Sequence, residues 1–112
     1  MRVLETFVSL DVADMARATR FYTGAFGASV SFASPAWSSL HVAGVRVGLH
    51  HNPHHRGVRA GLHLVVDDMA AALAAVEHAG GRIVSGPGEV APGVVVAEVA
   101  DSEGNGFALR RA

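Results

Sequence analysis

Hydrophobic and polar residues alternate along two short segments of the chain, residues 7–12 and 62–66. This period of two predicts β-strands that bury one face and expose the other. Directly after each segment, apolar residues recur every three or four positions, which predicts an amphipathic helix with its apolar face on the core. These helical residues are Met15, Ala18, Tyr22 and Ala25 in the first helix, and Met69, Leu73, Val76 and Ala79 in the second.

Each expected helix carries a start signal and a stop signal. Asp14 and Asp68 precede the first apolar helical residue, where a carboxylate can accept hydrogen bonds from the free amides of the first turn. Gly27 follows the first helix and the pair Gly80–Gly81 follows the second, and glycine commonly ends helices. We therefore expect each helix to begin after its aspartate and to end before its glycine.

Short strand candidates and turn residues alternate after each helix. Gly44, the run Gly86–Pro87–Gly88 and the segment DSEGNG at 101–106 supply turns. The expected strands are residues 28–33, 36–42 and 45–50 after the first helix, and 82–85, 93–99 and 106–111 after the second.

The chain repeats itself at an offset of 54 positions. LDVADMARATRFYTGAFGASV (10–30) aligns without gaps with LVVDDMAAALAAVEHAGGRIV (64–84), and both copies contain V-x-D-M with a glycine thirteen residues after the aspartate. The unit is β-α-β-β-β, present twice. We therefore expect an α+β fold with one domain over 1–112: module one at about 3–50, a linker at about 51–59 and module two at about 60–111.

Composition narrows the functional classes. The chain has 112 residues, is 50% hydrophobic and carries a net charge of −1 without a basic run, so it lacks the charge that nucleic-acid binding requires. It contains no cysteine, which excludes disulfides, thiolate metal sites and a catalytic thiol. No apolar run approaches the roughly 20 residues of a membrane span, and Glu5 interrupts any signal-peptide pattern. We expect a cytoplasmic protein that binds neither nucleic acid nor membrane.

The stretch LHHNPHHRG at 49–57 holds four of the seven histidines. Imidazole is a common metal ligand, but this stretch lies between the two modules, and Pro53 keeps it out of a regular helix or central strand. Nothing in such a segment fixes His51, His54 and His55 at a shared distance. We interpret the stretch as a connector.

The motifs VADM with RFYTGAFG, VDDM with EHAGG, and DSEGNGFAL complete a recognisable pattern. A duplicated βαβββ unit with these motifs resembles the vicinal oxygen chelate superfamily, which includes glyoxalase I, extradiol dioxygenases, fosfomycin-resistance enzymes and bleomycin-resistance binding proteins. The resemblance covers essentially the whole chain. It implies curved mixed sheets around a cup, helices on the outer face, and a homodimer in which units of two chains often pair.

In the metal enzymes of that superfamily each module supplies ligands from its first and last strands. The resemblance assigns these positions here to Phe7, Gly48, Gly61 and Ala108, and none of these side chains can ligate a metal. Because the four positions that the resemblance assigns lack metal ligands, we expect no metal and no other cofactor. The alternative is a site shifted by two residues along the strands, which would use His50 and His63 together with His41.

Alternate side chains of a strand point to the same face, so every second residue along each strand from those four positions should face the cup. The opposite residues of the same strands are uniformly apolar and should pack on the helices. The expected ligand-binding residues of the cup are Phe7, Ser9, Trp37, His41, Arg46, Gly48, His50, Gly61, His63, Glu98, Ala108 and Arg110. Glycine at 48 and 61 has no side chain, so we expect these two positions to leave open room in the cup.

Two functions are compatible with this cup. The first is a metal-independent small-molecule-binding protein that sequesters a neutral or anionic aromatic natural product against Trp37 and Phe7. The alternative is an enzyme of the same superfamily, an isomerase, cyclase, lyase or dioxygenase-like protein, in which His63 or His41 acts as a general base near Glu98 or a shifted histidine set binds metal. No catalytic residue is assigned from the sequence.

Overall fold

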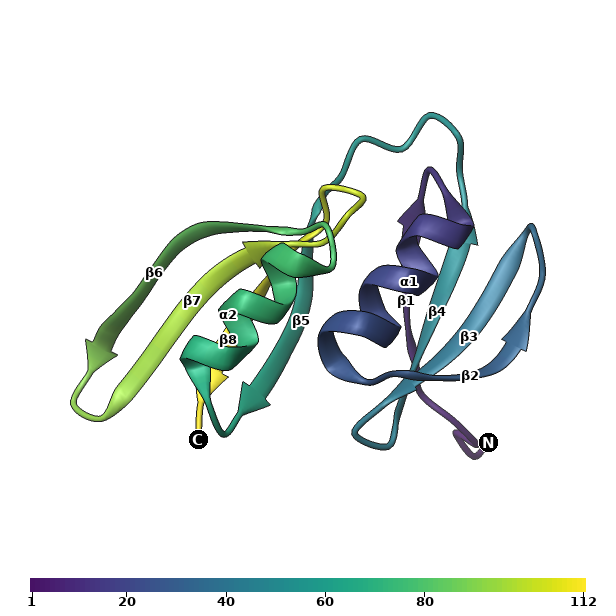
Figure 1. The fold of residues 1–112 in the computed structure, drawn as a ribbon. Coiled ribbons are helices and arrows are strands. Elements are labelled where there is room, and N and C mark those ends of the chain that lie inside the picture. The colour runs from purple at the N-terminus through teal and green to yellow at the C-terminus, as the bar shows by residue number, and fades with distance from the viewer.

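The computed structural model describes all residues, 1–112, and contains two modules side by side, each with one helix and a four-stranded mixed sheet (Figure 1). The α+β duplication expected from the repeat is confirmed. Module one comprises β1 (Val8–Val12), α1 (Met15–Phe26), β2 (Ser29–Ala33), β3 (Trp37–Val42) and β4 (Val45–His51). Module two comprises β5 (Arg59–Val66), α2 (Met69–His78), β6 (Arg82–Ala91), β7 (Val94–Ala100) and β8 (Gly106–Arg111).

The two sheets have the same topology. Their strand orders are β1-β4-β3-β2 and β5-β8-β7-β6, with the first strand parallel to the last and the other neighbours antiparallel. In module one α1 packs on β3 and β4, and in module two α2 packs on β6 and β8. Each helix therefore covers one face of its own sheet, and the other face of the sheet carries no helix.

The helix signals act as the sequence predicts at all four ends. The Asp14 carboxylate accepts from the Arg17 amide at 2.9 Å, and the Asp68 carboxylate accepts from the Ala71 amide at 3.0 Å. Gly27 ends α1 in the left-handed conformation, at φ 63°. At the end of α2 the cap residue is Ala79, and the left-handed residue is the following Gly80 at φ 101°.

The apolar faces of the strands and helices meet in one core that spans both modules. Val12, Leu40 and Leu49 of module one and Leu109 of module two are fully buried in it. The predicted alternation along the strands is therefore correct, because a slip of one residue would have placed the polar set on the helices.

Strand β6 is longer than predicted. It runs to Ala91 instead of ending at residue 85, and it contains Gly86 and Pro87 joined by a cis peptide bond. Proline lacks an amide hydrogen, and an edge strand such as β6 can accommodate it at an irregularity of the ladder. Strand β5 also begins at Arg59, inside the predicted linker, so the connector is 52–58.

The loop after β7 holds the two modules together. Buried Glu103 accepts hydrogen bonds from the amides of Ala13 at 3.0 Å and Asp14 at 2.9 Å, and it forms an ion pair with Arg17 at 2.7 Å. These amides lie at the start of α1, so Glu103 supplies an anion to the N-terminus of the other module's helix. The turn predicted at 101–106 is therefore also an inter-module clasp.

Two further residues of the same loop bind module one and the connector. Tyr22 donates its hydroxyl to the Asp101 carboxylate at 2.5 Å, in the buried core. Asn105 donates to the Asp11 carbonyl at 2.9 Å, and its side-chain oxygen lies 2.6 Å from His55 Nε2. His55 of the histidine-rich stretch thus has a structural partner, in line with the interpretation of that stretch as a connector.

Candidate functional site

The sheet face that carries no helix holds all the residues expected to line the cup, and we call it the helix-free face. The strand registers place Ser9, Trp37, His41, Arg46, Gly48 and His50 on this face of module one, with Phe7 just before β1. They place Gly61, His63, Glu98, Ala108 and Arg110 on the same face of module two. The expected residues therefore form two groups, one on each sheet.

In module one an aromatic cluster occupies this face. The rings of Phe7 and Trp37 meet edge to face, with centroids 6.1 Å apart, and the Arg46 guanidinium lies 3.9 Å from the centroid of the Phe7 ring. The indole N–H of Trp37 donates to the Ser39 hydroxyl at 3.0 Å. This bond leaves the indole with no unsatisfied donor and fixes its orientation.

Trp37 lies directly over Gly48. A Cβ atom at position 48 would be 2.2 Å from the indole ring, so no other residue fits beneath Trp37 as it stands. The sequence interpretation treated glycine at 48 as open room in the cup, and that interpretation is corrected here because the indole fills the space. At Gly61 the interpretation holds, since nothing lies within 4 Å of a Cβ at that position.

Two polar atoms of this face are buried without a hydrogen-bond partner, His41 Nδ1 and Arg46 Nε. The two residues are directly opposite each other in the β3–β4 register. The terminal nitrogen of Arg46 makes an ion pair with Glu5, which precedes β1.

At the other end of the same face, His50 Nδ1 lies 3.2 Å from the Asp11 carboxylate, which also accepts from the Asn52 amide at 3.1 Å. The hydrogen bond from Asn52 and the nearby His50 outweigh burial and lower the pKa of Asp11. This pair is exposed and lies where β1 and β4 end.

In module two the helix-free face is more polar and more open. Glu98 and His63 lie on either side of Ala108, in a row across β7, β8 and β5. Glu98 accepts from Arg59 at 2.8 Å, and no hydrogen bond joins it to His63 or His41. The pairing of a histidine with Glu98 that general-base chemistry would need is not formed.

Two residues of this face were missed by sequence reasoning. Arg59 pairs with Gly106 in register and lies on the helix-free face. It is two residues before Gly61 and so on the same side of the strand, but the predicted strand began only at residue 62. Phe32 pairs with Ser39 and is 56% exposed. An irregularity between Val30 and Phe32 changes the alternation, and the sequence carries no signal for it.

The side chains present do not fit the superfamily's metal centre. Phe7, Gly48, Gly61 and Ala108 offer no nitrogen or oxygen ligand, which a divalent ion requires. The shifted alternative is not assembled on module one, because His41 and His50 lie at opposite ends of the β3–β4 pair. No cluster of three or more His, Asp or Glu side chains in the chain could hold a metal ion.

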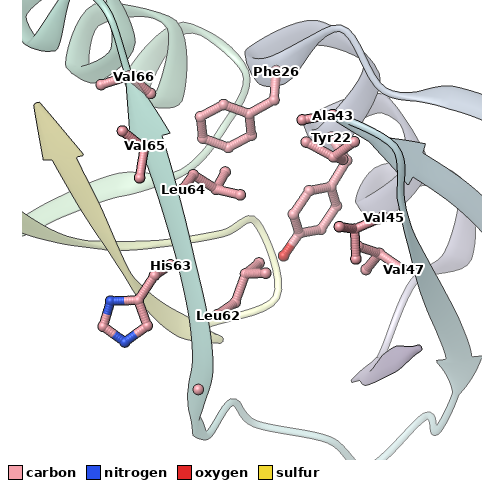
Figure 2. Close-up of a pocket in the computed structure, with 12 residues that line it drawn as sticks. Tyr22, Phe26, Ala43, Val45, Val47, Leu62, His63, Leu64, Val65 and Val66 are labelled. Atoms are coloured by element: carbon pink, nitrogen blue, oxygen red, sulfur yellow. The ribbon is translucent and has the colours of Figure 1, made fainter. Parts of the chain in front are cut away.

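A cavity lies elsewhere, on the helix side between the modules (Figure 2). It measures about 610 Å³. Figure 2 shows the side chains of Tyr22, Phe26 and Val45 turned toward Leu62 and Leu64 across the cavity, with His63 on the opposite side of β5. Tyr22, Val45, Leu62 and Leu64 were predicted to pack in the core. A smaller cavity of about 510 Å³ follows the seam between β1 and β5. The core is therefore incompletely closed where the two sheets meet.

Comparisons with known proteins agree with this architecture. A glyoxalase-like domain family model matches residues 7–110. A glyoxalase/bleomycin resistance protein/dioxygenase family enzyme from Burkholderia phytofirmans PsJN is 21% identical, with a TM-score of 0.80 over 94% of this chain and 95% of that chain. The fosfomycin resistance protein FosX from Listeria monocytogenes is 13% identical, with a TM-score of 0.82 over 100% and 95%.

A third solved structure is a bleomycin-binding protein complexed with bleomycin, 18% identical, with a TM-score of 0.71 over 98% of this chain and 99% of that chain. No curated protein sequence matches this chain. Neither helix of the structure has the length and apolar character needed to cross a membrane. On the family match and the duplicated fold together, the chain belongs to the glyoxalase-like domain family of the glyoxalase/bleomycin resistance/dioxygenase (vicinal oxygen chelate) superfamily.

Proposed function

We propose that this protein is a metal-independent small-molecule-binding protein that holds an aromatic organic ligand on the helix-free face. The observation that carries the proposal is the fixed indole of Trp37, seated on Gly48 and flanked by Phe7. An aromatic surface already held in place loses little conformational freedom when a planar ligand stacks on it. The four positions at which metal enzymes of the superfamily carry ligands hold Phe7, Gly48, Gly61 and Ala108. This favours a ligand held by direct contacts with side chains over a ligand coordinated by a metal ion.

The polar groups around the aromatic cluster would orient such a ligand. Arg46 lies against the Phe7 ring, and His41 is opposite Arg46 in the β3–β4 register. The separate group on module two would add charged or hydrogen-bonding side chains from Arg59, Glu98, His63 and Arg110. An apolar wall with a few placed polar groups is the usual make-up of a ligand site. Among the structural neighbours, one is a bleomycin-binding protein and one a fosfomycin resistance protein, so the fold is compatible with recognition of small natural products.

We propose further that the protein is a homodimer in which units of the two chains pair. The chain exposes 6537 Å² of surface, whereas a monomer of 11.6 kDa exposes about 5,800 Å². The surplus of about 700 Å² is close to the roughly 800 Å² that each partner buries in a standard interface. Multi-angle light scattering at micromolar concentration should give twice the chain mass, and a monomeric mass would refute this assembly.

Titration of Trp37 fluorescence, the one indole signal in the chain, tests the binding function directly. A panel of aromatic antibiotics and polyketides should include compounds that saturate the signal and are recovered unaltered. Phe7→Ala should weaken such binding about tenfold, because it removes the edge contact and about 1–2 kcal/mol of apolar burial. Val90→Ala, a substitution at an exposed apolar residue of β6, is the matched control and should leave binding unchanged.

A chemically altered ligand would show that the protein is an enzyme instead. Absence of saturation across the panel, or equal effects of Phe7→Ala and Val90→Ala, would remove the aromatic cluster from the site.

A further inference from the structure

Arg46 and His41 present unsatisfied hydrogen-bonding atoms side by side on the helix-free face. Arg46 Nε and His41 Nδ1 are both buried from solvent and have no partner in the protein. The two residues are directly opposite in the antiparallel β3–β4 pair, where facing side chains are about 5 Å apart at their Cβ atoms. Buried polar atoms in folded proteins are nearly always paired, so the unpartnered Arg46 Nε, which can only donate, indicates a missing acceptor.

The contacts of the other guanidinium atoms of Arg46 indicate which kind of acceptor this side chain binds. Its terminal nitrogen contacts the carboxylate of Glu5, and its central carbon lies over the Phe7 ring. Glu5 belongs to the segment before β1, which has no regular secondary structure and whose neighbour Leu4 is 81% exposed. The Glu5 side chain is itself 58% exposed, so its ion pair is solvated on one side.

We infer that the ligand of this face carries a carboxylate beside its aromatic ring, and that Glu5 occupies the carboxylate position while the site is empty. The inference rests on the proposed function, because it places the charged group of the ligand next to the Trp37–Phe7 cluster. A guanidinium binds a carboxylate through two parallel hydrogen bonds when both of its nitrogens on one edge are free. Glu5 engages the terminal nitrogen and leaves Nε unpaired, so a ligand carboxylate can form the more complete contact.

Glu5 therefore acts as an internal competitor. An exposed ion pair contributes little to stability, so displacing Glu5 costs the protein little. The ligand carboxylate replaces one acceptor on Arg46, adds an acceptor for Nε, and offers a partner to His41. A neutral ligand of the same shape would gain only the ring contacts and would leave Glu5 in place.

Isothermal titration calorimetry with a matched pair of probes, 2-naphthoate and 2-naphthamide, tests this inference at pH 7. The two compounds share the ring and differ in charge. The wild-type chain should bind 2-naphthoate about tenfold more tightly than 2-naphthamide. Arg46→Met, which keeps the length of the side chain and removes the charge, should abolish this preference, so that the variant binds the two probes with affinities within about twofold of each other.

Glu5→Gln removes the competitor and is the sharper variant. It should tighten 2-naphthoate binding about two- to fivefold and leave 2-naphthamide binding unchanged. Glu77→Gln, at an exposed carboxylate of α2, is the matched control for the change in net charge and should alter neither affinity. Circular dichroism melting curves establish that each variant is folded.

The outcomes separate this inference from the proposed function. Equal binding of the two probes to the wild type, or a preference that survives Arg46→Met, overturns the carboxylate assignment while the aromatic site stands. A 2-naphthoate affinity that does not change in Glu5→Gln overturns the role of Glu5. Binding of neither probe overturns this inference, whereas the proposed function is overturned only if the aromatic panel also gives no saturation.

Discussion

Replacing Glu103 by glutamine should show how strongly one side chain couples the two modules. The Glu103 side chain is fully buried, and its two oxygens accept from the amides of Ala13 and Asp14, from Arg17 and from the Ser102 hydroxyl. Glutamine has the same shape but only one acceptor oxygen. Whichever way the amide is turned, its NH2 group faces donors, so at least two hydrogen bonds are lost.

The magnitude follows from the environment of the pair. Breaking a buried ion pair typically costs about 3–5 kcal/mol, but Arg17 is 49% exposed and can be rehydrated. We expect a loss of about 2–3 kcal/mol in the free energy of unfolding at pH 7. For a chain of this length the unfolding entropy is about 0.24 kcal/mol/K, so the midpoint temperature should fall by about 10 °C.

The pH dependence of this loss distinguishes a charged contact from a change in packing. Burial opposes ionisation of Glu103, but hydrogen bonds from Arg17 and the Asp14 amide outweigh it and lower the pKa of Glu103 below 4.5. The ionised carboxylate therefore stabilises the fold above pH 4.5, and this stabilisation is lost as the pH falls through the lowered value. The difference between wild type and Glu103→Gln should be largest at neutral pH and shrink in acid.

Urea unfolding followed by circular dichroism at several pH values measures both quantities. Glu77→Gln serves as the control for a glutamate-to-glutamine change at an exposed position. A loss below about 0.5 kcal/mol, which is typical of a surface substitution, would refute the clasp. A loss that stays constant from neutral to acid pH would refute its electrostatic origin.

Two further substitutions test other contacts of the fold. Tyr22→Phe removes the hydroxyl that donates to Asp101 and should cost about 1–2 kcal/mol in urea unfolding at pH 7. Burial and the Asp101 carboxylate raise the pKa of Tyr22 well above 10.0, so the wild type should lose stability as the pH rises above 10. Urea titrations in that pH range should show that Tyr22→Phe lacks this pH-dependent loss of stability. Gly48→Ala places a Cβ against the Trp37 ring, so it should lower the free energy of unfolding by about 1–3 kcal/mol and shift Trp37 emission to longer wavelength. Gly61→Ala, with open space around its Cβ, should change neither quantity. Unchanged emission in Gly48→Ala would show that the indole does not rest on that glycine.

The sequence by itself determined the duplication and the buried side of strands β1, β4, β5 and β8. The repeat at an offset of 54 places the same signals in both modules, and Asp14, Asp68 and Gly27 act locally through neighbouring amides and their own backbone. Alternation along a strand is equally local, because successive side chains point to opposite faces. These features could be predicted because each depends on residues a few positions apart.

Only the tertiary structure decided what lies next to what across those elements. Trp37 covers Gly48 because β3 and β4 are in register, and Glu103 reaches α1 because the loop after β7 folds against the other module, 90 positions away in sequence from Ala13. The irregularity that turns Phe32 to the helix-free face and the cavity between the modules depend on how strands and sheets fit together. Such contacts join distant residues, and no local period or motif encodes their distances, so the contents of the site had to come from the packed chain.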